Sequence, residues 1–61
     1  MATQYVWVWR HYTYNDQRVM VVRNFEGDVI VMSVKDNGMA YGPARLIDKS
    51  TFMKTATLVP A

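Results

Sequence analysis

The side chains that could carry out catalysis or bind a metal ion are few and widely spaced in this sequence. His11 is the single histidine and no cysteine is present, so thiolate and multi-histidine metal sites are excluded. A serine nucleophile needs an activating base nearby, and nothing in the spacing of Ser33 and Ser50 indicates that either meets His11. The acidic residues occur singly and mostly beside predicted turns: Asp16, Glu26, Asp28, Asp36 and Asp48. We therefore expect a protein that is not an enzyme and that binds no metal ion or organic cofactor.

Two tryptophans near the start of the chain are the strongest candidates for contact with another molecule. Trp7 and Trp9 alternate with Val6 and Val8, so this segment is apolar on both faces if it forms a strand. Such a strand is usually buried on both faces, and in a domain this small the outer cover would have to come from another chain. The indoles therefore either pack in the core or form a contact surface. The residues expected on that surface are Trp7, Trp9, His11, Met20, Val22 and Val31.

Binding of single-stranded nucleic acid is a second interpretation of the same segments. Basic residues interleave with aromatic ones along the first predicted strands, as in small barrels that hold single strands by stacking and by phosphate-facing cations. The residues concerned are Arg10, Arg18, Arg23 and Lys35, with Trp7, Trp9, Tyr12 and Tyr14. The basic residues form no run, however, so the expected attraction for phosphate is weak. A protein partner or self-association is therefore the leading expectation, with nucleic acid second.

Turn signals divide the chain into short strands. Two-residue turns are predicted at Asn15-Asp16, Glu26-Gly27 and Asn37-Gly38, and Pro43 is expected to end the fourth strand because it cannot donate to a ladder. The predicted strands are Tyr5–Tyr12, Arg18–Phe25, Asp28–Lys35, Met39–Gly42 and Thr55–Val59. A short helical turn is predicted over Asp48–Lys54, with Asp48 or Ser50 as N-cap and with Phe52 and Met53 facing inward.

This order of elements is that of an all-β, small five-stranded antiparallel SH3-like barrel with one short helical turn before the last strand. The resemblance concerns architecture alone, because the acidic and aromatic loop motifs of peptide-binding SH3 domains are absent. No binding residue is therefore carried over from those domains. The length of 61 residues allows one domain, spanning 1–61.

The turns also predict which side chains share a face, since turn length fixes the register of a hairpin. The Glu26-Gly27 and Asn37-Gly38 turns place one set of mostly apolar residues in the core: Val19, Val21, Phe25, Ile30, Met32, Val34 and Tyr41. In the first hairpin, a two-residue Asn15-Asp16 turn puts Val6, Val8 and Tyr12 inside and both indoles outside. A three-residue loop there would reverse the assignment.

Composition adds few constraints on function. The net charge is +2, and no apolar stretch approaches the roughly 20 residues that a membrane span needs. The N-terminus lacks the pattern of a secretion signal, so a cytoplasmic protein is expected.

A chain this short folds with a thin stability margin, which self-association as a dimer or larger oligomer would increase. Small size without an enzyme motif is typical of phage or mobile-element accessory proteins that bind and modulate a host protein, and we expect a function of that kind.

Overall fold

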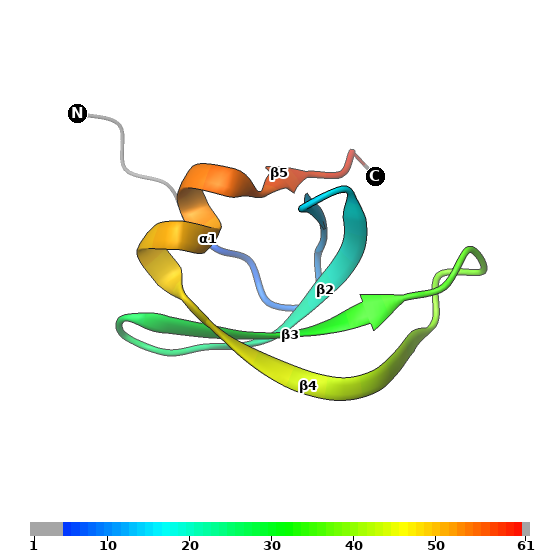
Figure 1. Cartoon of the computed structure of the whole chain (residues 1–61), viewed down its shortest axis with the longest axis horizontal. Helices are drawn as coiled ribbons and strands as arrows, with labels where there is room; N and C mark the ends of the chain where they lie inside the picture. Colours follow the sequence, from blue (N-terminus) through cyan, green and yellow to red (C-terminus); the bar gives the residue numbers. More distant parts are fainter. Residues whose placement is uncertain (1–4, 61) are drawn as a thin grey trace.

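The computed structural model describes residues 5–60, which form a five-stranded antiparallel sheet and one short helix (Figure 1). The strands are β1 (His11–Tyr14), β2 (Gln17–Asn24), β3 (Asp28–Val34), β4 (Ala40–Asp48) and β5 (Thr57–Leu58), and helix α1 (Lys49–Thr55) lies between β4 and β5. The strand order is β4-β3-β2-β1-β5, so β4 and β5 are the edges and the curled sheet is not closed. The predicted all-β architecture is confirmed in this form, as an open antiparallel sheet.

The first hairpin has the two-residue turn that the sequence predicts. Asn15 and Asp16 both adopt left-handed backbone conformations, with φ of 52° and 62°. Asn and Asp tolerate this conformation, and two such residues are typical of the turn whose twist matches a hairpin. The turn pairs Tyr12 with Val19, and both side chains are buried.

The helical turn is also confirmed, together with its cap. Asp48 is the N-cap of α1, and its Oδ2 atom accepts a hydrogen bond of 3.1 Å from the backbone N–H of Thr51. The helix places Phe52 over the core with only 1% of its surface exposed. The Phe52 ring lies 5.2 Å from the ring of Tyr12 and 5.4 Å from that of Tyr14, measured between centroids. Because α1 continues to Thr55, the last strand is shorter than predicted.

The core differs in part from the predicted one. Its contacting buried residues are Val6, Tyr12, Val19, Val21, Val29, Val31 and Phe52. The inward positions of Val19 and Val21 were predicted correctly. In β3, however, Val29 and Val31 point inward, whereas Ile30 and Met32 are half-buried on the other face. Val34 is buried as predicted, although it lies outside this cluster. Phe25, also predicted for the core, has a side chain that is 50% exposed.

A β-bulge in β2 explains this difference. Val21 pairs with Val31 and Arg23 pairs with Ile30, so Val22 is an extra residue between the two pairs. A regular ladder from Val21 would have turned Arg23 into the core, where an unpaired guanidinium group is strongly unfavourable. The bulge instead leaves Arg23 exposed and shifts the inward positions of β3 by one residue.

The third hairpin, which joins β3 to β4, does not have the predicted two-residue Asn37-Gly38 turn. The N–H of Lys35 donates to the carbonyl of Met39 at 2.9 Å, which makes a three-residue loop of 36–38, with Gly38 at φ 88°. The loop shifts the register so that Tyr41 pairs with Ser33 and is exposed rather than buried. Pro43 does not end the strand: β4 continues to Asp48, because an edge strand tolerates a residue without an N–H.

Candidate interaction surface

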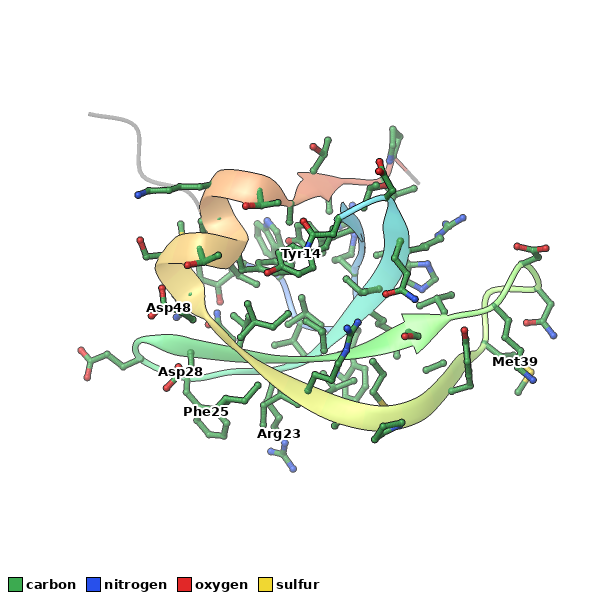
Figure 2. The ribbon with its side chains drawn as sticks, viewed as in Figure 1. Tyr14, Arg23, Phe25, Asp28, Met39 and Asp48 are labelled. Carbon is green, nitrogen blue, oxygen red and sulfur yellow. The ribbon has the colours of Figure 1, made fainter. Side chains whose placement is uncertain are left out.

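The sheet has one face that packs on the core beneath α1 and an opposite face, here called the outer face. Figure 2 shows the side chains of Arg23 and Phe25 projecting from the outer face, away from the helix. Leu46 shares this face because it pairs with Ile30, which in turn pairs with Arg23. Phe25 and Leu46 are 50% and 66% exposed. The outer face therefore presents large apolar side chains to solvent.

A shallow groove runs over part of the outer face. Its volume is about 690 Å³, and it joins residues before β1 to residues of β2 and β3. The lining residues define the outer groove: Val8, Trp9, Met20, Val22, Arg23, Asn24, Phe25 and Met32. Trp9, Met20 and Val22 were predicted for the contact surface, and the structure brings these three together.

Trp9 reaches the groove through a second bulge, which lies before β1. The N–H of Trp9 donates to the carbonyl of Val21 at 2.7 Å, and the N–H of Val21 donates to the carbonyl of Arg10 at 3.2 Å. Trp9 and Arg10 thus both lie opposite Val21, and Trp9 has a φ of 70°, the left-handed position that glycine usually fills in such a bulge. The predicted first strand is interrupted here, and β1 begins at His11.

The conformation of Trp9 is strained. For a residue with a Cβ atom, the left-handed conformation is less favourable than the right-handed one by about 1–2 kcal/mol. The indole is 66% exposed, so packing within this chain recovers little of that cost. Strain of this kind is often found at functional sites.

Trp7 does not share the outer groove. Its indole packs edge-on against the ring of Tyr5, with 4.7 Å between the centroids, and it lines a separate hollow beside Leu58 of β5. The N–H of Trp7 donates to the Tyr12 hydroxyl at 3.0 Å. Trp7 and Trp9 are only two residues apart in the sequence, but their indoles therefore lie on different surfaces.

Removing the Tyr12 hydroxyl is expected to destabilise the fold by about 1 kcal/mol, because the partly buried N–H of Trp7 would lose this acceptor. We expect the melting temperature of Tyr12→Phe to fall by roughly 4–8 °C. Tyr14→Phe is the control, since it removes a hydroxyl from the same strand and preserves ring stacking on Phe52. Equal melting temperatures for the two variants would contradict this role of Tyr12.

The remaining predicted contact residues divide between the two faces. His11 pairs with Met20, and its Nδ1 atom accepts a hydrogen bond of 3.1 Å from Nε of Arg18, so it lies beside the groove. Val31 is fully buried in the core, and its prediction as a contact residue is wrong because the β2 bulge inverts the faces of β3.

Sequence reasoning missed part of the groove: Val8, Arg23, Asn24, Phe25 and Met32. The signal that could have found these residues is Arg23 itself. A charged residue at an inward position of an otherwise apolar alternation predicts a bulge, and a bulge places Arg23 and its neighbours on the outer face.

The groove is apolar and positively charged. Arg23 is the charged residue among the described side chains that line it, and Arg18 lies close by, because it donates to His11, which pairs with Met20. Asn24 lies at its margin: the side-chain Nδ2 donates to the carbonyl of Val6 at 2.9 Å, while the buried Oδ1 finds no partner within residues 5–60.

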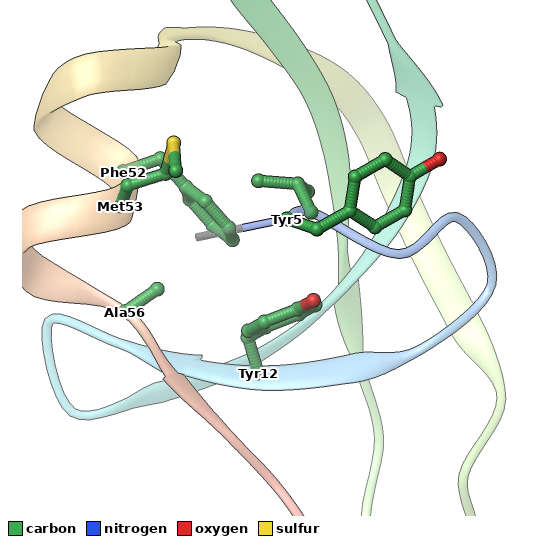
Figure 3. A pocket seen from close by; sticks show the side chains of 6 residues that line it. Tyr5, Tyr12, Phe52, Met53 and Ala56 are labelled. Carbon is green, nitrogen blue, oxygen red and sulfur yellow. The ribbon is translucent and has the colours of Figure 1, made fainter. Parts of the chain in front are cut away.

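A third hollow, between α1 and the first segment of the chain, is nearly filled. Figure 3 shows Phe52 and Met53 of the helix facing Tyr12 of β1 across it. Its volume is about 30 Å³, which is space for little more than one water molecule. This hollow is too small to hold an organic ligand.

Residues 5–60 contain no group of three or more His, Cys, Asp or Glu side chains placed to hold a metal ion. Within the same residues, no helix has the length and apolar character needed to cross a membrane.

No family model, curated protein or solved structure matches this chain.

Proposed function

We propose that this domain is a non-enzymatic protein-interaction module and that the outer groove is its contact surface. The observation that carries the proposal is the exposure of large apolar side chains on one face: Trp9, Phe25 and Leu46. Contiguous apolar surface of this kind usually marks an interaction site in a small protein. The order β4-β3-β2-β1-β5, with a helix before β5, supports a partly open SH3-like barrel as its scaffold.

The lining of the groove favours a protein over single-stranded nucleic acid. Nucleic-acid grooves combine several stacking aromatics with a row of cations that follows the phosphates. Here two thioethers, Met20 and Met32, and two valines occupy much of the lining, with Arg23 as the charged member. Methionine-rich apolar surfaces with tryptophan and arginine are typical of protein contacts.

The proposal is tested with two variants that each remove one exposed apolar side chain. Phe25→Ser changes the outer groove, and Leu58→Ser changes the separate hollow beside Trp7. Each protein is used to capture partners from nuclease-treated lysate of the source cells, with quantitative mass spectrometry as the readout. We expect wild type and Leu58→Ser to retain a common protein whose recovery falls about 30-fold or more with Phe25→Ser, the loss typical of a hot-spot residue.

Light scattering and an oligo(dT) titration complete the test. A wild-type oligomer that Phe25→Ser dissociates would replace this function with that of a homo-oligomer subunit. Salt-dependent binding of oligo(dT) that Phe25→Ser abolishes would replace it with nucleic-acid binding. Equal recovery of every protein by the wild type and Phe25→Ser would exclude the outer groove as the contact surface.

A further inference from the structure

We infer that the outer groove accepts a protein segment in which a carboxylate side chain is flanked by large apolar side chains, and that Arg23 binds the carboxylate. This inference rests on the proposed function and adds to it the chemistry of the partner. The apolar side chains of the segment would lie against Met20, Val22 and Met32, between the exposed rings of Trp9 and Phe25.

The position of Arg23 carries the inference. The β2 bulge places it after Val22 and opposite Ile30, so the guanidinium group is set among apolar neighbours on the outer face. A guanidinium group offers a planar pair of donors that matches the two oxygens of a carboxylate. Apolar surroundings strengthen such an ion pair once a partner excludes water.

No carboxylate of this chain lines the groove among the described residues. Asp28 is the first residue of β3 and Asp48 caps α1, and the other acidic residues lie at hairpin turns: Asp16, Glu26 and Asp36. Arg18 lies beside the groove, next to His11, and adds to its positive charge. A second copy docked face to face would therefore oppose cations with cations, whereas an acidic segment of another protein would be attracted.

The strain at Trp9 is an independent observation that points to a bound partner. Its left-handed backbone holds the indole at the margin of the groove, 66% exposed, where it packs little against its own chain. A partner that covers the indole would supply the apolar contact that this chain does not. Tryptophan and arginine are also the residues most often found to dominate binding energy.

The test is selection from a random twelve-residue peptide library displayed on phage, carried out against wild type, Arg23→Gln and Arg23→Glu. Arg23 is exposed, so both substitutions are compatible with the fold, and each variant is checked by its far-UV spectrum. We expect wild type to enrich peptides with Asp or Glu between large apolar residues. Arg23→Gln should lose the acidic preference, and Arg23→Glu should replace it with Lys or Arg. Arg18→Gln, which changes a cation outside the groove lining, should keep it.

The strongest wild-type peptide is then synthesised together with its Glu→Gln or Asp→Asn twin, and both are titrated against wild type. We expect the neutral twin to bind about tenfold to a hundredfold more weakly to wild type and equally to Arg23→Gln. Enriched peptides that bind at the outer groove but ignore the charge at residue 23 would overturn this inference and leave the proposed function standing. Enrichment that is the same on Phe25→Ser as on wild type would overturn both, as would binding of oligo(dT) in place of peptides.

Discussion

The Phe52→Ala variant is expected to be largely unfolded at 25 °C. Phe52 is 1% exposed and packs on the rings of Tyr12 and Tyr14, so its removal leaves a cavity between α1 and the sheet. Truncation of a buried phenylalanine costs about 3–5 kcal/mol. A core in a domain of this size rarely supplies more than about 3–5 kcal/mol in total, so the loss is comparable with the whole stability. Urea titration followed by far-UV circular dichroism measures it.

Phe25→Ala is the matched control for this prediction. The same chemical change is made at a side chain that is 50% exposed on the outer face, and we expect it to cost about 1 kcal/mol or less. A denaturation midpoint that falls as far for Phe25→Ala as for Phe52→Ala would show that the assigned core is wrong.

Replacing Trp9 is expected to separate binding from stability. Trp9→Gly and Trp9→Ala both remove the indole, so each should weaken binding of a groove partner by about 30-fold or more. At φ 70°, however, glycine avoids the steric cost that alanine still pays, so Trp9→Gly should be more stable than Trp9→Ala by about 1 kcal/mol. Thermal melts and titration with a selected peptide measure the two effects on the same samples.

Two results would contradict this view of Trp9. Equal stability of the glycine and alanine variants would mean that the backbone at this position is not left-handed. Unchanged peptide binding by both variants would remove the indole from the contact surface, and the partner would then have to rest on Phe25 and the methionines.

The sequence by itself determined the elements that depend on local chemistry. Asn15 and Asp16 specify their turn because both tolerate a positive φ, and this turn alone places Tyr12 opposite Val19. Asp48 specifies the start of α1 because its carboxylate satisfies an N–H that the helix leaves free. The register that the turns set identifies Val19 and Val21 as core, since this stretch precedes the bulge in β2.

Only the tertiary structure decided the composition of the contact surface. A bulge adds one residue to a strand, and because side chains alternate with a period of two, one residue exchanges the faces. The bulge at Val22 is favoured by effects in two strands. In β2 it keeps Arg23 exposed to solvent, and in β3 it lets Val29 and Val31 fill the core. The bulge at Trp9 joins residues that are 12 apart in the chain through hydrogen bonds to Val21. Local propensity does not determine either bulge, so the outward positions of Arg23 and Met32, and the presence of Trp9 but not Trp7 beside them, follow from the folded sheet.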